Sequence, residues 1–357
     1  MSIPRIERSG AVSLRDVAAR AGVSGQTVSR VANDHPNVSP ATRSRVLAAM
    51  AELGYRPNGA ARALRRGAFA SIGVVVFDLQ TLGNLRTLGA VADRAAALGY
   101  AIELIQVDAE PAVRADGVSS ALTRLGRHAV DGIVVVIESQ LVSAVTLEFP
   151  AGIPSVVVES GDRPDIPSVN TDQTQGSELA VGHLLSLGHP TVQHIAGPAA
   201  SNSAHERTAA WRAALERAGR SVPSPLTGDW SADSGYRAGL VLADDPEVTA
   251  VYAANDQMAL GAMHAFHERG VRIPQEVSIV GFDDMAESSQ FWPPLTTVHQ
   301  DFEAAGATAV DLIVREIETG HSDPGLHTID TRLIVRESTG PYGGARVGRI
   351  IQREEHE

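Results

Sequence analysis

A short polar stretch near the amino terminus carries side chains that could read nucleic acid. In GVSGQTVSR, residues 22–30, a serine stands at a favourable helix start, and the apolar positions are spaced to face inward, which turns the polar side chains outward. Glutamine can pair with adenine and arginine with guanine in the major groove, whereas serine and threonine hydroxyls suit phosphates. The outward residues are Gln26, Thr27, Ser29 and Arg30. They predict a DNA-reading helix, and the alternative is the solvated face of a small helical bundle.

Three short helices would position this stretch. Helices are expected over 13–22, 24–32 and 39–54, because each range begins with a serine that can cap a helix. Pro40 suits the first turn of the third helix, and glycines end the first and the third. The first two helices, with the short turn between them, have helix-turn-helix proportions.

The charge is divided unevenly along the chain. Residues 1–67 hold 11 arginines against 4 acidic residues, a net charge of +7, whereas the remaining residues carry −19 and the whole chain −12. A basic segment on an acidic body favours a nucleic-acid-binding part joined to something else. Regional variation of the surface charge is the alternative.

The composition excludes several kinds of chemistry. The chain has no cysteine, which excludes disulfides, thiolate metal sites and cysteine nucleophiles. All 30 basic residues are arginines, which excludes a P-loop lysine, Schiff-base chemistry and pyridoxal phosphate attachment. The sequence contains neither a nucleophile elbow nor a glycine-rich phosphate loop. We therefore expect no cofactor and no enzymatic activity.

Two further features bear on metals and membranes. His183, His189 and His194 match no compact zinc motif, so we expect core or surface histidines and no metal. Residues 1–10 are polar and lack the apolar region of a secretory signal, and no apolar run approaches membrane-spanning length. We expect a cytoplasmic protein without a membrane partner.

The body of the chain, residues 70–341, alternates apolar runs with helical stretches. This alternation is typical of parallel sheets covered on both faces by helices. The body is too long for one compact sheet, so two similar lobes with a cleft between them are expected. The segments are Ile72–Phe77, Arg86–Leu98, Ala101–Gln106, Gly132–Ile137, Ser155–Glu159, Glu178–Leu187, Val192–Ala196, Glu206–Ala218, Ala250–Ala253, Gln257–Arg269, Val277–Gly281 and Ala304–Glu318.

Both parts of the chain resemble the LacI/GalR family of bacterial repressors. The head does so over about sixty residues, in LRDVAARAGVSGQTVSRVAND, VSPATRSRVLAAMAELGYRPN and ARAL. The body does so in HLLSLGH (183–189), IAGP (195–198), GDWSADSG (228–235), ANDQMALGAM (254–263) and PPLTTVHQDF (293–302). The segments follow one another in the family's order.

The resemblance implies the domain organisation. An all-α helix-turn-helix head would occupy 1–57, a hinge helix or linker 58–69, a ligand-binding core 70–341 and a short polar tail 342–357. The core would resemble periplasmic sugar-binding proteins, an α/β fold of two doubly wound parallel-sheet lobes. The N-lobe would comprise about 70–169 and 302–329, and the C-lobe about 170–301 and 330–341.

The resemblance also implies contacts with DNA. In the family, the hinge becomes helical on the operator and inserts a leucine into the minor groove, which here would be Leu64, with Ala61 near its symmetry mate. A flexible linker is the alternative. The predicted DNA-binding residues are Ser13, Ser24, Gly25, Gln26, Thr27, Ser29, Arg30, Asn33, Ser39, Thr42, Asn58, Ala61 and Leu64.

One residue of the reading helix departs from a known pattern. In one member of the family a base-reading tyrosine stands at the position of Gly25. The glycine removes a direct contact and leaves the backbone free to approach the groove. We therefore expect an operator that is altered or relaxed at the base pair that Gly25 faces.

A sugar site needs groups that grip neighbouring hydroxyls and a flat apolar face. By resemblance, the hydroxyl-gripping residues are Arg207, Asn255 and Asp283, the pocket wall is Trp230, and further lining residues are Gln300 and Phe302. Taken singly, these residues have alternatives, namely a surface arginine, a helix cap and a turn.

Gln175 is also expected at the ligand. It stands where a galactoside-binding member of the family has an aspartate that contacts the sugar. Because an amide cannot offer two acceptors to two hydroxyls, the identity of the sugar is open.

Together these features predict a ligand-responsive transcriptional repressor. It would bind a pseudo-palindromic double-stranded DNA operator as a homodimer and be released by a small sugar or glycoside. The tail lacks the sustained leucine heptads that would make a tetramer, which favours the dimer. The alternatives are a corepressor-dependent regulator of the same fold, a sugar receptor without DNA function and, third, a sugar hydrolase.

Overall fold

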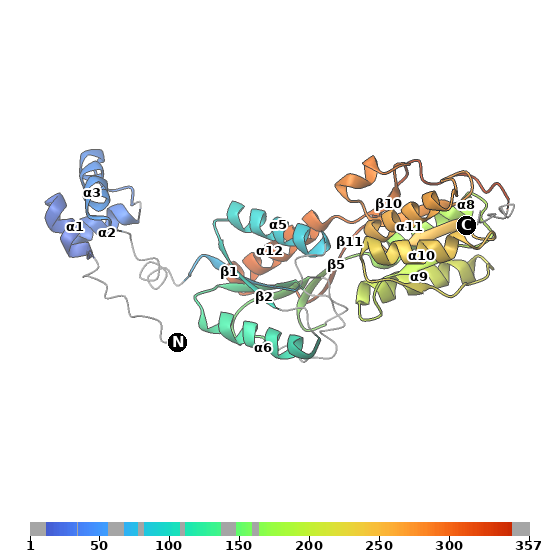
Figure 1. Ribbon diagram of the computed structural model, residues 1–357. Coiled ribbons are helices and arrows are strands. Elements are labelled where there is room, and N and C mark those ends of the chain that lie inside the picture. The colour runs from blue at the N-terminus through green and yellow to red at the C-terminus, as the bar shows by residue number, and fades with distance from the viewer. Residues whose placement is uncertain are drawn as a thin grey trace, which may run out of the picture. The chain divides into compact units, whose positions relative to one another are not determined.

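The computed structural model has two compact units, Met1–Ala70 and Ser71–Glu357. It describes residues 12–33, 35–55, 68–77, 82–107, 111–136, 148–158 and 164–344. In the first unit the described residues form the helices α1 (Leu14–Ala21), α2 (Gly25–Ala32) and α3 (Pro40–Leu53), labelled in Figure 1.

Each helix of the first unit begins at a capping serine, as predicted. The hydroxyl oxygens of Ser13, Ser24 and Ser39 accept hydrogen bonds from backbone N–H groups in the first turns of α1, α2 and α3. Such a cap stabilises a helix by about 1 kcal/mol. Gly22 and Gly54 end α1 and α3 with φ of 64° and 62°, a region that glycine enters without strain. A small apolar core then joins the helices: Val17, Ala18, Ala21, Val28, Val31, Val46, Ala49 and Met50.

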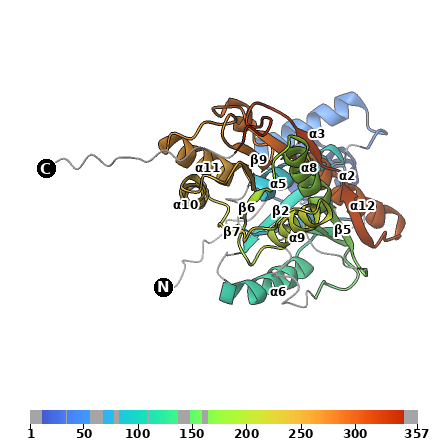
Figure 2. The same ribbon diagram turned by 90° about the vertical axis from the view of Figure 1, so that its right-hand side faces the viewer.

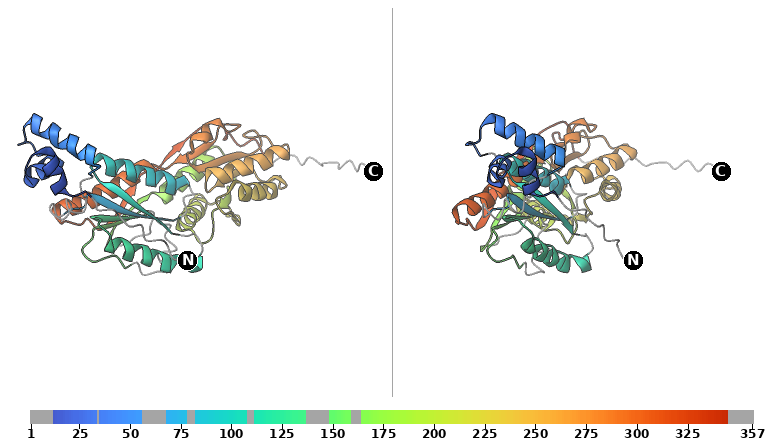
Figure 3. Two further views of the ribbon diagram at one scale, coloured as in Figure 1. Left: turned by 60° about the vertical axis from the view of Figure 1, so that its left-hand side comes forward. Right: turned by 90° about the vertical axis from the view of Figure 1, so that its left-hand side faces the viewer.

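The second unit contains two sheets, of which the first is wholly parallel. Its strands are β1 (Ser71–Phe77), β2 (Ala101–Val107), β3 (Gly132–Val136), β4 (Ser155–Val158), β5 (Pro167–Thr171) and β11 (Gly325–Ile329), in the order β11-β5-β4-β3-β1-β2. The helices are α5 (Leu82–Ala97), α6 (Pro111–Arg127) and α12 (Phe302–Thr319). Helices α5 and α12 pack on one face, and α6 covers the other (Figures 1 and 3). We call this part the first lobe.

The second sheet is parallel except at one edge. Its strands are β6 (Gln193–Ala196), β7 (Leu226–Thr227), β8 (Ala250–Ala253), β9 (Ser278–Asp283), β10 (Thr296–His299) and the antiparallel β12 (Arg332–Ile334), in the order β12-β10-β9-β8-β6-β7. The helices are α8 (Gln173–Ser186), α9 (Asn202–Arg217), α10 (Ala232–Ala243), α11 (Asp256–Glu268) and the 3-10 helix η1 (Ala286–Gln290). Figure 2 shows α8 and α9 on one side of this sheet and α10 and α11 on the other. We call this part the second lobe.

The chain passes between the lobes three times. The first connection joins β5 to α8, the second joins β10 to α12, and the third joins β11 to β12. This arrangement confirms the predicted fold class, a helix-turn-helix head with a core of two doubly wound lobes. No helix in the described ranges is both long and apolar enough to span a bilayer.

Several elements extend beyond the sequence expectation. Helix α8 begins at Gln173, five residues before the expected Glu178, and α9 begins at Asn202 rather than Glu206. The expectation also lacks the helices α6 and α10 and the strands β5, β7, β10, β11 and β12. The signal of an element is weak where it mixes polar and small residues, as in PSVNT of β5.

Candidate functional site

A buried charge pair lies at the carboxyl end of the second sheet. Arg207 is in the second turn of α9, and Asp283 is the last residue of β9. Arg207 Nη1 lies 3.6 Å from Asp283 Oδ1, and the two residues are 5% and 8% exposed. Arg207 Nε donates to Gln173 Oε1 at 2.8 Å, and its Nη1 donates to the carbonyl oxygen of Ala254. The guanidinium is therefore held by contacts from several directions.

Two aromatic rings flank the guanidinium of Arg207. Its Cζ atom lies 3.9 Å from the ring centroid of Phe282 and 5.4 Å from that of Trp230. Aromatic faces attract cations, and an indole also offers a flat surface to the C–H face of a sugar. A Cβ on Gly197 would overlap the Trp230 ring, so a glycine is required where this ring packs.

Backbone strain is concentrated at the end of β9. Asp283 and Asp284 have φ of 109° and 51°, a region that residues with a side chain seldom adopt. Gln300 Nε2 donates to Asp283 Oδ1 at 2.6 Å. Burial raises the pKa of Asp283 to about 6, and the charge of Arg207 opposes that rise. The Asp283 carboxylate, paired with Arg207 and bonded to Gln300, is thus carried on a strained segment of backbone.

Asp284 makes a separate set of contacts. Its carboxylate accepts from Arg336 Nη2 at 2.6 Å and lies 2.9 Å from His299 Nδ1. Burial acts to raise its pKa, but the hydrogen bonds and charges of Arg336 and His299 hold the pKa below its usual value. Asp284 is therefore a charged structural anchor beside the candidate site.

A second buried carboxylate lies at the start of α11. Asp256 accepts hydrogen bonds from the Met285 N–H at 2.9 Å, the Ser288 hydroxyl at 2.6 Å and the Thr297 hydroxyl at 2.5 Å. Burial, with the nearby charge of Asp283, raises the pKa of Asp256 to about 7.

Asn255 combines a helix cap with a contact to the site. Its Oδ1 accepts from the Met258 N–H at 2.9 Å, which caps α11. Its Nδ2 donates to the carbonyl oxygen of Trp230 at 3.0 Å. Trp230 itself has φ of 71°, so Asn255 ties a strained position to the start of α11.

The structure brings together five of the seven predicted ligand residues. Arg207, Trp230, Asn255, Asp283 and Gln300 are joined directly by the contacts above. Phe302 is buried at the start of α12, and Arg86 Cζ lies 5.2 Å from its ring centroid.

Gln175 does not reach this group. Its Oε1 accepts from the Thr331 N–H at 2.6 Å and from the Thr331 hydroxyl at 3.0 Å. Gln173, two residues earlier, contacts Arg207 instead. Sequence reasoning misses Gln173, because nothing local in the sequence distinguishes one glutamine from the other.

The three histidines have structural partners. His194 is fully buried, its Nδ1 donates to the Tyr252 carbonyl oxygen at 2.9 Å, and burial lowers its pKa to about 4. His189 contacts the hydroxyls of Thr249 and Ser278, and His183 contacts Thr339.

In the head, two predicted base-reading side chains are exposed. Gln26 and Arg30 both project from α2, and neither has a hydrogen-bond partner among the described residues. A Cβ on Gly25 would lie 3.1 Å from Leu14 Cδ2, so the start of α2 packs closely on α1. The surface of α2 therefore presents exposed donors and acceptors beside a residue without a side chain.

The other predicted DNA-binding residues of the head take part in capping contacts. The hydroxyls of Ser24 and Thr27 lie 3.0 Å apart, and Ser39 donates to Thr42 at 2.9 Å. Ser13 donates to Asp16 at 2.7 Å, and Asn33 Nδ2 donates to the Ser29 carbonyl at 2.6 Å. The predicted hinge residues Asn58, Ala61 and Leu64 lie outside the described residues.

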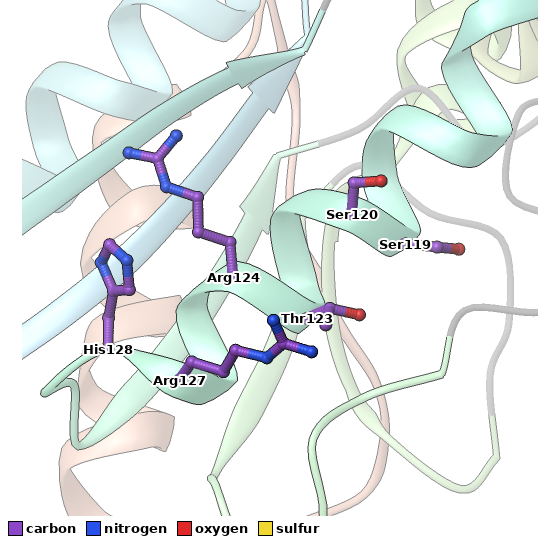
Figure 4. A pocket seen from close by; sticks show the side chains of 6 residues that line it. All are labelled: Ser119, Ser120, Thr123, Arg124, Arg127 and His128. Carbon is purple, nitrogen blue, oxygen red and sulfur yellow. The ribbon is translucent and has the colours of Figure 1, made fainter.

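A cavity of about 650 Å³ lies elsewhere, along the carboxyl-terminal half of α6 (Figure 4). It is lined by Ser119, Ser120, Thr123, Arg124, Arg127 and His128. Arginines at the carboxyl end of a helix complement its dipole, which accounts for Arg124 and Arg127 without a ligand. The cavity includes none of the predicted ligand residues.

Comparison with known proteins matches both parts of the chain. Residues 13–58 match the family of bacterial regulatory proteins, lacI family, and residues 181–339 match a periplasmic binding protein-like domain. The chain is 36% identical to the lactose operon repressor of Escherichia coli (strain K12) over 330 residues, which is 92% of this chain and 91% of that one.

Solved structures show the same relationship. A lac repressor dimer bound to operator and the anti-inducer ONPF has a TM-score of 0.83 and 36% identity, over 93% of this chain and 100% of that chain. The transcriptional regulator CelR in complex with cellobiose has a TM-score of 0.65 and 30% identity, over 92% and 99%. With the helix-turn-helix head and the two-lobed core described above, this chain belongs to the lacI family of bacterial regulatory proteins.

Proposed function

We propose that this chain is a transcriptional repressor that binds a pseudo-palindromic DNA operator as a homodimer and is released by a small neutral sugar or glycoside. We infer the class of effector from the buried pairing of Arg207 with Asp283 beside the ring of Trp230. A guanidinium and a carboxylate can form hydrogen bonds with neighbouring sugar hydroxyls, and an indole packs against the C–H groups of the sugar ring. The cellobiose complex of CelR supports a carbohydrate ligand.

The charges near the site favour a neutral effector. Arg207 is paired with Asp283, and Arg86 forms two hydrogen bonds with the Glu303 carboxylate, at 3.0 and 3.1 Å. An anionic sugar phosphate would have to compete with both carboxylates for these guanidinium groups. A polyol can add hydrogen bonds to a paired site without breaking the pairs.

Operator binding is proposed from the head. The exposed Gln26 and Arg30 side chains on α2 are suited to base edges, and the capping hydroxyls to phosphates. A two-fold dimer presents two such helices to two half-sites, which is how helix-turn-helix proteins read palindromes. The operator complex of the lac repressor dimer supports this arrangement.

Large exposed apolar side chains support the homodimer. Trp292 is 93% exposed although the adjacent Phe291 is buried in the second-lobe core. Leu260 on α11 and Leu104 on the edge strand β2 are also exposed. Burying such side chains against a second copy removes apolar surface from water in both lobes.

The effector would act by a shift between two states. A sugar that binds better when the lobes are closed changes their relative position in each subunit of the dimer. The two heads then no longer fit both half-sites, and operator affinity falls by the ratio of the sugar's affinities for the two states.

The test is operator binding by the full chain, measured by fluorescence anisotropy with the palindrome nearest its own promoter. Neutral mono- and disaccharides are titrated, with sugar phosphates and purines in parallel. Weakened binding with a neutral sugar is the expected result. Strengthened binding with a purine or a sugar phosphate, and no effect of any neutral sugar, would mean corepression. Sugar binding without DNA binding would leave a receptor.

A further inference from the structure

Side chains tie the first two connections between the lobes to one another. The first connection lies between Thr171, at the end of β5, and Gln173, at the start of α8, and Gln300 follows β10 in the second. Gln173 Nε2 donates to Thr171 Oγ1 at 2.8 Å and to Gln300 Oε1 at 2.9 Å. The hydroxyl of Thr171 also donates to Gln300 Oε1. All three side chains are buried.

The third connection is tied to the first by different residues. The Asp172 N–H donates to the Ile329 carbonyl at 2.9 Å, and the Thr331 hydroxyl donates to the Asp172 carbonyl at 3.2 Å. Gln175 Oε1 accepts from both the N–H and the hydroxyl of Thr331. Gln173 and Gln175 are thus two glutamines in the same helical turn that bind different connections.

Of these two glutamines, Gln173 extends the network to the candidate ligand site. Its Oε1 accepts from Arg207 Nε at 2.8 Å, and the two residues are 3% and 5% exposed. Because Nε carries a single hydrogen in the plane of the guanidinium, this bond sets the direction in which the fork of Arg207 points. The same amide therefore contacts the first lobe through Thr171, the second connection through Gln300, and the ligand-facing arginine.

We propose that Gln173 is a positioning residue that orients Arg207 for the effector and links that guanidinium to the connections between the lobes. The proposal rests on the ligand site proposed above. When sugar hydroxyls engage Arg207, any rotation of its guanidinium is transmitted through one buried amide to Thr171 and Gln300. Gln175 also forms side-chain hydrogen bonds to a connection between the lobes, through Thr331, but it does not contact Arg207. It is therefore a matched control for Gln173.

A double-mutant cycle tests the link to Arg207 without a ligand. Gln173→Leu, Arg207→Met and the double variant are compared by urea unfolding of the full chain. The fold-change in the unfolding equilibrium constant for the double variant should differ from the product of the two single-variant fold-changes by at least about tenfold, as for residues in direct contact. In the control cycle, Gln175→Leu with Arg207→Met, the fold-changes should multiply. If the double variant in the Gln173 cycle also shows just the product of the single-variant fold-changes, the proposal is overturned.

A second variant separates the two roles of the amide. Gln173→Glu keeps an acceptor for Arg207 Nε but loses both donors, to Thr171 and to Gln300. It should retain the coupling with Arg207 that Gln173→Leu loses. It also keeps the experiment decisive if the leucine variant does not fold, since loss of coupling in Gln173→Glu would contradict the proposed orientation of Arg207.

The ligand arm uses lactose and cellobiose as probes, measured by isothermal titration calorimetry. For whichever disaccharide the wild-type chain binds, Gln173→Leu should weaken affinity by at least about tenfold, the cost of disordering one charged hydrogen-bonding group. Gln175→Leu should change it by less than about twofold. Equal affinity for the wild type and Gln173→Leu would refute the positioning role. Failure of the wild type to bind either disaccharide counts against the proposed effector alone, because the unfolding cycle decides the role of Gln173 without them.

Discussion

The guanidinium of Arg207 and the carboxylate of Asp283 lie 3.6 Å apart with less than a tenth of either residue exposed. Each charge thereby compensates the burial of the other, and both are held by further hydrogen bonds, from Gln300 and to Gln173. A pair of this kind is costly to break from one side, because the remaining charge stays in a medium that solvates it poorly.

Removing one partner should therefore be worse than removing both. Arg207→Met is expected to lower the free energy of unfolding by about 3 kcal/mol, since Asp283 loses its cation. Adding Asp283→Asn should recover most of that loss, because no uncompensated charge is left. Urea unfolding at neutral pH measures all three variants. If the double variant is as unstable as the sum of the single ones, the pair is not the source of the effect.

The raised pKa of Asp256 should make stability depend on pH. Its folded pKa is about 7, against 3.8 for the ordinary group, so between pH 4 and 7 the folded protein holds a proton that the unfolded chain has lost. Stability must then fall as pH rises through this window, by at most about 1.4 kcal/mol per pH unit for one group, and level off above it.

Asp256→Asn is the variant that isolates this contribution. Its amide oxygen can still accept hydrogen bonds, but the group does not titrate. The stability of the variant relative to the wild type should therefore increase from pH 4 to 7 and then stay constant, as measured by thermal and urea unfolding. A difference that does not change with pH would show that Asp256 is ionised throughout.

Two glycines of the second lobe should respond in opposite ways to alanine. Gly197→Ala would place a Cβ inside the Trp230 ring's present position, so the ring must move; a shift in tryptophan emission and weaker sugar binding are expected. Gly182 lies within α8, and a methyl group added there would meet none of the described atoms within 4 Å. Gly182→Ala should therefore raise the free energy of unfolding by about 1 kcal/mol. Unchanged emission and affinity in Gly197→Ala would place Trp230 outside the ligand site.

Gly25 should set part of the operator preference. Gly25→Tyr adds a large side chain at the start of α2, and its Cβ requires Leu14 to shift by a few tenths of an ångström. Selection from a randomised operator library should then favour a different base pair at one symmetric position of each half-site, by about 1–3 kcal/mol. Gly25→Ala is the control, since it makes the same demand on Leu14 without reaching a base. If Gly25→Tyr and the wild type select identical operator sequences, Gly25 does not set the operator preference.

The helices of the head can be predicted because their signals are local. Ser13, Ser24 and Ser39 cap the turns that follow them, and Gly22 and Gly54 end helices through their own φ values. The apolar strands β1 and β3 can likewise be predicted, since strands buried on both faces read as continuous valine and isoleucine runs.

The parts that cannot be predicted depend on contacts distant in sequence. Strand β5 begins with Pro167 and contains Asn170, and it becomes a strand because it lies between β4 and β11. Gln173 is buried by Arg207 and Gln300, which follow it by 34 and 127 residues. Family resemblance located Arg207 and Asp283, but it gave no basis for choosing Gln173 over Gln175 as the partner of the arginine.

The second connection between the lobes has a consequence for synthesis on the ribosome. The face of the first sheet that includes Ile72, Val74 and Val134 is covered by α5 and α12, and α12 is made only after the second lobe up to Gln300. Strand β11 follows still later. A nascent chain that ends near Gln300 therefore has a finished head, a nearly finished second lobe and a first lobe in which α5 alone covers one apolar face. Since domains fold as their residues emerge, the first lobe to be translated is expected to be the last to fold, and the part of this face that α12 later covers is the surface that chaperones would protect.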